Sequence, residues 1–540
     1  MTASLPTPNP PQTREIPSAT ESQPSGLPPF SATRTVQEYI DETPCWRDGT
    51  KIAEVPMTAM QWQIWGLASA GKFFEGLVVF MTGVALPLIA IEYGLSASQK
   101  GLVGSATLFG ILIGATALGG LADHLGRKQV FIAEMVLFLV FLVAMTLSPN
   151  FPLLLVFLFG MGLALGCDYP TAHLVISESI PSNCRGRLVL SAFAFQAVGA
   201  IVGTGIGYMI LRCHPEVNDW RLMYATAIIP TILVVIGRFF IPQSPHWLMM
   251  RGRVDEAEDA VLRLLNRDPK YPKTLVLEPV ADEESTQEHQ KSSFKKLFNK
   301  KHRRATALAS IPWFLQDIGT YGIGIFTPVI LSTILGHSNQ QEPNLAGVIH
   351  NDMIAAKGAA FLDLLLLVGI VFAIFLADRV GRMKLQVFGF VGCAVGLLLA
   401  AFSTQMSAGT TQTVLIFAGF MLFNFMNNLG PNAMTYLIAG EVFPTKIRGS
   451  GAGFAASFAK IGAVLTAFLF PVLLSEISTA TLLYCLVGSC LLGAFVTWRF
   501  GIETMGVNLE TIGQSPSRKR DGAHPPAGGH SSPIQTNSKR

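Results

Sequence analysis

The chain has 540 residues, of which 50% are hydrophobic and 14% are charged; its mean hydropathy is +0.44 and its net charge +4. Because soluble domains have about 25% charged residues, this composition excludes a soluble protein and indicates a membrane protein. The basic residues gather in short loops and tails, so the charge gives no indication of nucleic-acid binding. Seven scattered cysteines without a C-x-x-C pair indicate neither a disulfide framework nor a metal site.

The first 56 residues are rich in Pro, Ser and Thr and do not have the pattern of a cleavable signal peptide, so we expect a disordered tail. Twelve apolar runs follow, each with the roughly 17 to 25 residues that cross a bilayer. They begin near Trp62, Gly101, Val130, Leu153, Leu188, Leu222, Ala307, Phe361, Leu385, Thr413, Ala452 and Thr481. The sequence therefore predicts an all-α polytopic membrane protein.

A polar stretch separates the first six runs from the last six. We predict a six-helix bundle over residues 57–245, a cytoplasmic linker over 246–304, a second bundle over 305–504 and a disordered C-terminal tail over 505–540. Residues 254–265 have apolar residues at helical spacing and predict a short amphipathic helix in the linker.

Basic residues in short loops are retained on the cytoplasmic side of a membrane. Here they gather in the loops that follow even-numbered runs, for example Arg127, Arg185, Arg382 and Arg448. Both termini are therefore expected in the cytoplasm, with the chain in a plasma or bacterial inner membrane. Compact loops and the lack of targeting signals favour a bacterial membrane.

Two charged loop motifs occur once in each half of the chain. G-L-A-D-H-L-G-R-K at 120–128 is echoed by L-A-D-R-V-G-R at 376–382, and E-x-x-P-x-x-x-R-G begins at both Glu178 and Glu441. The chain is therefore an internal duplication, which is how many secondary transporters form a site between two halves.

The acids and arginines of these loops can pair into a latch that breaks and re-forms during a transport cycle. The alternative is that the arginines only set the topology. The residues concerned are Asp123, Arg127, Glu178 and Arg185 in the first half, and Asp378, Arg382, Glu441 and Arg448 in the second.

The G-x-L-A-D-x-x-G-R-K loop resembles the signature of the major facilitator superfamily, and P-Q-S-P-H-W-L at 242–248 is similar to a segment of its sugar-porter-like branch. The resemblance covers about residues 62–500. It implies twelve transmembrane helices in two pseudo-symmetric six-helix bundles, in a transporter and not an enzyme. The fold does not specify the substrate, which has to be argued from the site.

A charge at the bilayer centre costs about 2.5 to 3.5 kcal/mol, so it is rarely kept without a role. Six candidates are Lys72, Glu75, Asp168, Asp317, Asp363 and Lys460. Lys72 and Glu75 lie one turn apart and can neutralise each other. Asp363 is expected near the outer end of its helix, facing solvent.

Asp168 precedes Pro170, which breaks the helix ladder beside an acid. A partly desolvated carboxyl there can load and release a proton. The alternative is a structural acid, hydrogen-bonded to the backbone or to His173.

Trp313, Asp317 and Tyr321 recur at i, i+4 and i+8, which places them on one helix face. Hydrogen-bond donors and a cation come from Gln196, Asn432 and Lys460 on other helices, so these residues together predict a site for a small anion. The alternative for the two aromatic residues is packing.

This constellation resembles the phosphate:proton symporters of the superfamily, which have a D-Y-P in helix four, W-F-L-x-D-x-x-x-Y in helix seven, G-P-N in helix ten and a lysine in helix eleven. The resemblance implies proton coupling by Asp168, Asp317 and, less directly, Glu75, because that family has aspartate in the first helix. It implies that the substrate ligands are Tyr169, Gln196, Trp313, Asp317, Tyr321, Asn432 and Lys460.

The leading hypothesis is a monomeric proton-coupled importer of a small anion, with inorganic phosphate first and organic carboxylates second. The proton gradient is its energy source, and no cofactor or metal is expected. A porter of sugars or other neutral metabolites and a nutrient sensor that hardly transports remain alternatives. An enzyme is least favoured, because the sequence has no Ser-His-Asp set, metal cluster or nucleotide-binding loop.

Overall fold

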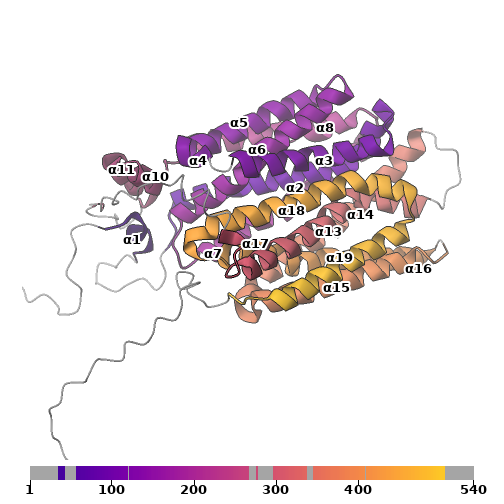
Figure 1. Cartoon of the computed structure of the whole chain (residues 1–540). Coiled ribbons are helices and arrows are strands. Elements are labelled where there is room, and N and C mark those ends of the chain that lie inside the picture. Colours follow the sequence, from indigo (N-terminus) through magenta and orange to yellow (C-terminus); the bar gives the residue numbers. More distant parts are fainter. Residues whose placement is uncertain are drawn as a thin grey trace, which may run out of the picture.

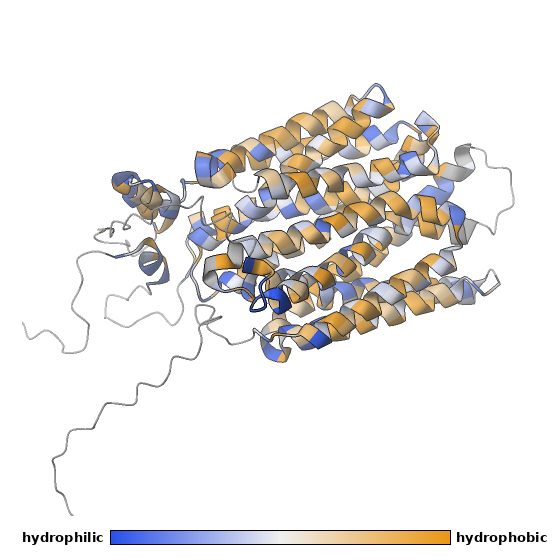
Figure 2. Cartoon of the chain, viewed as in Figure 1, coloured by the Kyte–Doolittle hydropathy of each residue, from blue (hydrophilic) through white to orange (hydrophobic). Residues whose placement is uncertain are grey.

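The computed structural model describes residues 34–42, 56–118, 121–266, 275, 277, 296–336, 345–407 and 409–504. Within these residues twelve helical spans are long and apolar enough to cross a membrane, as predicted. They lie side by side in two groups of six, the first half of the chain in one and the second half in the other (Figure 1). Hydrophobic residues predominate along the spans, and hydrophilic residues gather at the helix ends (Figure 2).

The spans of the first half are α2 (Ala59–Tyr93), α3 (Ala97–Ile113), α5 (Arg127–Thr146), α6 (Phe151–Ser179), α7 (Arg185–Cys213) and the pair α8 (Asp219–Ala225) and α9 (Ile228–Phe240). Those of the second half are α13 (Arg303–Gly336), α14 (Leu345–Val380), α15 (Arg382–Ser403), the pair α16 (Thr410–Leu429) and α17 (Pro431–Glu441), α18 (Thr445–Glu476) and α19 (Thr479–Phe500). Short elements are α1 (Val36–Asp41), the π-helix η1 (Gly114–Leu118), α4 (Leu121–Leu125), α10 (Pro245–Met250) and α11 (Val254–Leu264).

Local capping explains where the first spans begin. The Thr58 hydroxyl accepts from the Gln61 backbone N–H and the Gln61 side chain accepts from the Thr58 N–H, and Ser96 and Gln99 repeat this arrangement before α3. These reciprocal bonds satisfy N–H groups that a helix start would leave without partners.

The predicted start of the eighth span, near Phe361, is wrong. Helix α14 begins at Leu345 and its membrane-spanning part at Ile349. Asp352 and Lys357 in its first turns lowered the local hydropathy and hid the true start. The correction places Asp363 at the middle of the span Ile349–Ala377 and not at its outer end.

Part of the predicted disordered N-terminal tail is a helix. Asp41 of α1 accepts hydrogen bonds from the backbone N–H and the hydroxyl of Ser182, at 2.8 and 2.7 Å. Val36, Tyr39 and Ile40 are buried in a cluster with residues of α10 and α11. The amphipathic linker helix predicted over 254–265 is confirmed as α11. Most of the predicted tails lies outside the described residues.

We call the side of the bundle that carries α1, α10 and α11 the linker side (Figure 1). The two halves contact each other along α2 with α13, α7 with α14 and α3 with α18. On the side away from the linker, α2 approaches the backbone of α13 and α3 approaches the backbone of α18. A Cβ added to Gly83 would lie 2.1 Å from the Ile325 carbonyl oxygen, and one on Gly101 would lie 2.2 Å from that of Phe468. The opposite side is therefore closed.

A larger residue at this seam is expected to prevent closure. In Gly83→Val the added side chain must push α13 away from α2, so substrate uptake should fall at least about tenfold while the protein still folds with the halves apart. The matched control is Gly205→Ala in α7, because nothing lies within 4 Å of a Cβ added there. Equal uptake by the two variants in proteoliposomes would show that the opposite side does not need this contact.

Candidate functional site

A cavity lies between the halves. Its walls combine ionisable, amide, aromatic and aliphatic side chains from both halves. They are Lys72, Ile111, Ala115, Phe193, Gln196, Trp313, Asp317, Tyr321, Asn432, Ala456 and Lys460. Six of the seven predicted substrate ligands are thus brought together. Nothing is described for the side chain of the seventh, Tyr169.

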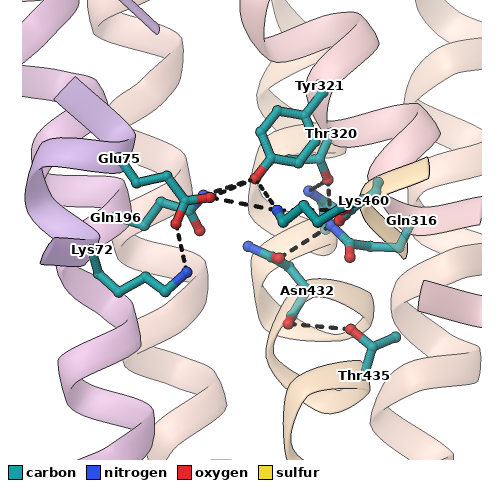
Figure 3. Close-up of polar contacts among 11 residues, drawn as sticks. Lys72, Glu75, Gln196, Gln316, Thr320, Tyr321, Asn432, Thr435 and Lys460 are labelled. Atoms are coloured by element: carbon teal, nitrogen blue, oxygen red, sulfur yellow. Dashed lines mark hydrogen bonds and ion pairs between the residues drawn. The ribbon is translucent and has the colours of Figure 1, made fainter. Parts of the chain in front are cut away.

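Lys460 of α18 is the centre of this site. Its Nζ lies 2.6 Å from the Tyr321 hydroxyl, 3.4 Å from Asp317 Oδ2 and 3.5 Å from Glu75 Oε1. Glu75 belongs to the first half, whereas the other three residues belong to the second, so one ammonium group connects the two halves (Figure 3). Asp317 Oδ2 is buried and accepts no hydrogen bond among the described residues.

The first half contributes a second ion pair, between Lys72 and Glu75 of α2. Lys72 Nζ lies 2.5 Å from Glu75 Oε2, which confirms the predicted contact between them. The other Glu75 oxygen accepts from Tyr321 at 3.0 Å and from Gln196 at 3.4 Å (Figure 3). Glu75 is thus satisfied from both halves, whereas Asp317 is held by its ion pair with Lys460 of the same half.

Amide side chains that the sequence reasoning missed support the predicted ligand Asn432. Its oxygen accepts from Gln316 Nε2 at 3.1 Å, and its amide donates to Asn428. The Thr320 hydroxyl accepts from Gln316 at 2.6 Å and from Asn427 at 2.8 Å. Gln316 and Thr320 follow Trp313 on α13 and directly precede Asp317 and Tyr321 in the sequence. This position could have identified them as residues of the site.

The charges at this site balance. Two lysines and two carboxylates, Lys72, Lys460, Glu75 and Asp317, lie around one cavity, so the site is neutral when all four are ionised. A small anion that enters must compete with Glu75 and Asp317 for the lysines. Protonation of one carboxylate removes that competition, because a neutral acid no longer attracts the ammonium groups.

Asp168 does not line the cavity. Its Oδ1 accepts from Arg238 Nη2 of α9 at 2.6 Å, and Arg238 Nη1 also donates to Glu134 Oε1 of α5 at 3.0 Å. Among the described residues its partner is Arg238 and neither a backbone group nor His173, so the structural alternative in its predicted form is wrong. All three side chains are nearly inaccessible, and two carboxyl groups share one guanidinium. Such a pair is suited to hold one proton between its members.

The two acids that share Arg238, Asp168 and Glu134, are adjacent to the cavity. A Cβ added to Gly71 would lie 1.6 Å from Asp168 Oδ2, so only glycine leaves room for the carboxyl beside α2. The next residue, Lys72, interacts electrostatically with Asp168 as well as with Glu75. A change of charge at Asp168 is therefore felt by a lysine of the cavity.

Tyr436 of α17 covers the cavity toward the linker side. Its ring stacks on Phe193 of α7, with centroids 4.8 Å apart, and meets the edges of Trp313 and His173 at 6.3 Å. Trp313 is therefore both a cavity wall and part of this aromatic contact. On this side the contact between the halves is thus made by aromatic side chains, Phe193 of the first half against Tyr436 of the second.

The predicted latch forms in both halves with the same geometry. Arg127 Nη2 lies 3.1 Å from Glu178 Oε1, and Arg382 Nε lies 3.2 Å from Glu441 Oε2. Arg185 does not join Glu178 as predicted, because its guanidinium is directed to the Ile180 carbonyl and the Ser182 hydroxyl. The side chains of the other predicted members lie outside the described part, namely Asp123, Asp378 and Arg448.

In each latch a hydroxyl group also donates to the glutamate, a contact that was not predicted from the sequence. The Ser244 hydroxyl donates to Glu178, and the Thr504 hydroxyl donates to Glu441 at 2.6 Å. The preceding residues, Gln243 and Glu503, accept from the N–H groups at the start of α5 and α15, at 2.8 and 3.0 Å. The Q-S and E-T dipeptides that end the two halves are therefore a third repeated motif.

One further prediction about an acid changes. Asp363 is 3% exposed and its Oδ2 is hydrogen-bonded to Thr204 Oγ1 at 3.1 Å, so its expected position in solvent is wrong. Glu134 and Arg238 were missed, although a lone acid in an apolar run such as that of Glu134 is the same signal that selected Asp168. Among the described residues, no group of His, Cys, Asp and Glu is arranged to hold a metal ion.

Relatives with known or assigned transport roles cover most of the chain. It is 30% identical to the putative metabolite transport protein YaaU of Escherichia coli (strain K12), over 83% of this chain and 92% of YaaU. It is 28% identical to the niacin transporter NiaP of Acinetobacter baylyi, over 86% and 99% of the two chains. It is 27% identical to the putative inorganic phosphate transporter C1683.01 of Schizosaccharomyces pombe, over 84% and 88%.

The fold is that of a solved transporter. A partially occluded, inward-open structure of the xylose transporter XylE from E. coli superposes with a TM-score of 0.66 at 20% identity, covering 84% of this chain and 100% of XylE. Residues 62–515 match the family described as "Sugar (and other) transporter". The chain therefore belongs to the sugar (and other) transporter family of the major facilitator superfamily, and it is a secondary transporter, not an enzyme.

Proposed function

We propose that the chain is a proton-coupled symporter of a small anion that works by alternating access between its two halves. The observation that carries this proposal is the charge-balanced cavity, in which Lys460 is held by Asp317 from its own half and by Glu75 from the other. A neutral solute needs no lysine at its binding site. An anion needs a cation, here Lys460, which leaves its carboxylate partners when the anion binds.

The sign of the charges supports coupling to a proton. With an anion bound and both carboxylates ionised, the cavity has one uncompensated negative charge. Two unit charges about 4 Å apart repel each other by about 4 kcal/mol near a protein surface, which is enough to expel the substrate. Protonation of Asp317, which forms an ion pair with Lys460 at 3.4 Å, restores neutrality. Anion and proton are therefore expected to bind together and leave together.

The direction of transport follows from the expected orientation. With the linker side in the cytoplasm, the present conformation is closed to the outside and covered by the Tyr436 contact toward the inside. Opening that contact exposes the cavity to the less acidic cytoplasm, where the proton is lost and the re-formed carboxylate repels the anion. This sequence of events is import driven by an inward proton gradient.

Two classes of anion suit the cavity. Six groups can donate hydrogen bonds to the oxygens of inorganic phosphate, from Lys72, Gln196, Trp313, Tyr321, Asn432 and Lys460. Apolar walls favour instead an organic carboxylate with an apolar part, and they are formed by Ile111, Ala115, Phe193 and Ala456. The niacin transporter and the putative phosphate transporter among the relatives match these two classes. We place phosphate first.

The test is uptake by the purified protein in proteoliposomes, with and without an inward proton gradient. Radiolabelled phosphate and nicotinate are the probes, with glucose as a neutral competitor. Gradient-stimulated uptake of either anion is expected. Uptake of glucose alone would support the neutral-solute porter, and tight binding of an anion without uptake would support the sensor.

A further inference from the structure

Asp363 is a buried acid that the proposed cycle does not use. It lies at the middle of the span Ile349–Ala377 of α14, and its side chain faces α7 of the other half. Thr204 Oγ1, at 3.1 Å from Asp363 Oδ2, is its hydrogen-bond partner among the described residues. A carboxyl group at this depth is expensive unless it is paired or neutral.

The protonation state of Asp363 can be inferred from the Thr204 hydroxyl, which has a single proton to donate. Thr204 Oγ1 also lies 2.9 Å from the Ala200 carbonyl oxygen, to which a helical threonine ordinarily donates. An ionised Asp363 would have to take this proton away from Ala200. A protonated Asp363 donates to Thr204, which then still donates to Ala200, so both hydrogen bonds form.

No charged side chain of the neighbouring helices contacts Asp363 among the described residues. Helix α14 packs against α2, α7, α13, α15, α16 and α17. Glu75 of α2 and Asp317 of α13 are turned toward Lys460, and Arg382 of α15 toward Glu441 of α17. The sequence of α16 has no charged residue. The remaining charges of α7 and α13 are near the helix ends, at Arg185, Arg187, Arg212, Arg303 and Arg304.

We propose that Asp363 is a further proton-binding site, at the seam between the halves, and that a proton must bind there before the halves close on the side opposite the linker. Thr204 and Asp363 belong to different halves, so opening that side separates them and admits water to the carboxyl. The site is then loaded from the outside solution. This inference rests on the alternating access of the proposed function, and it adds a dependence of closure on external pH.

Infrared difference spectroscopy tests the bound proton directly and needs no transport. The spectrum of the purified wild type at neutral pH minus that of Asp363→Asn should contain the C=O stretch of a protonated carboxylic acid. Asparagine keeps the size of the side chain and can donate to Thr204, so this variant is expected to fold. The control is Glu476→Gln, because Glu476 is exposed at the end of α18. A wild type without this band, or with a band that Asp363→Asn leaves unchanged, would overturn the assignment.

Exchange of labelled for unlabelled anion across the membrane tests the gating role, with no proton gradient imposed. When the pH is above the pKa of a carboxyl group, its protonated fraction falls about tenfold per pH unit. Wild-type exchange should therefore fall steeply as the external solution is made alkaline. Asp363→Asn should reduce that slope, and Thr204→Ser should keep it. Identical slopes in wild type and Asp363→Asn would contradict the gating role, whereas exchange of no anion by any variant would contradict the proposed function and leave the infrared result standing.

Discussion

Lys460→Ala is expected to abolish anion uptake while the protein still inserts in the membrane and folds. Among the described residues, Lys460 is the cation with ion pairs to both halves, to Asp317 at 3.4 Å and to Glu75 at 3.5 Å. Without it, Asp317 faces the cavity with no cation of its own half, and an entering anion meets one positive charge fewer. We expect uptake to fall by at least about a hundredfold, equivalent to about 2.7 kcal/mol.

The measurement is initial uptake rate against external anion concentration, normalised to the amount of folded protein in the membrane. Lys357→Ala is the matched control, because Lys357 is also on a spanning helix but is exposed and far from the cavity. Uptake by Lys460→Ala equal to that of the control would rule out an anion site at this lysine. Unchanged uptake of glucose would then favour the neutral-solute porter.

Asp317→Asn separates binding from coupling at the same site. The amide imitates a protonated Asp317, so Lys460 stays available and the anion is expected to bind at least as tightly as in the wild type. Release to the inside needs the carboxylate to re-form, however, so net import should be lost. Binding by the purified variant without import by its proteoliposomes is the expected pair of results, and normal import would remove Asp317 from the proton cycle.

The twelve spans were predictable because a bilayer requires one simple property, a long apolar run, and that property is local in sequence. The eighth span shows the limit. Asp352 and Lys357 interrupt its first turns, although Asp352 is buried among the helices and Lys357 is exposed. Hydropathy along the chain does not show which charged residue will be buried and which will be exposed.

Residue types selected six side chains that line one cavity, but the sequence predicted no pair at that site apart from Lys72 with Glu75. Spacing placed Asp317 and Tyr321 on one face of α13, and only the packing of α18 and α2 against that face brings Lys460 and Glu75 to them. Arg238 shows the same limit more strongly. It ends an apolar run and therefore resembles a basic flank, yet it is fully buried, with Asp168 70 residues away in the sequence and Glu134 104 residues away.

That buried triad leads to the second large effect. Asp168→Asn is expected to keep exchange of anion across the membrane but to abolish its accumulation against a concentration gradient. The fold should survive, because Arg238 keeps Glu134 as its counter-ion at 3.0 Å. The pair can no longer share a proton, however, and an amide does not titrate. Glu134→Gln should give the same result, since either change removes one of the two acids.

The result depends on which partner of the triad is removed. Arg238→Leu would leave two buried acids without a cation, a loss of about 3 to 5 kcal/mol, so that variant is expected to fail to accumulate in the membrane. Combining it with Glu134→Gln should recover part of the folded protein. The ratio of inside to outside anion at steady state, beside the exchange rate, distinguishes these cases. Full accumulation by Asp168→Asn would mean that this triad stabilises the first half of the chain without moving protons, and would leave Asp317 as the site of coupling.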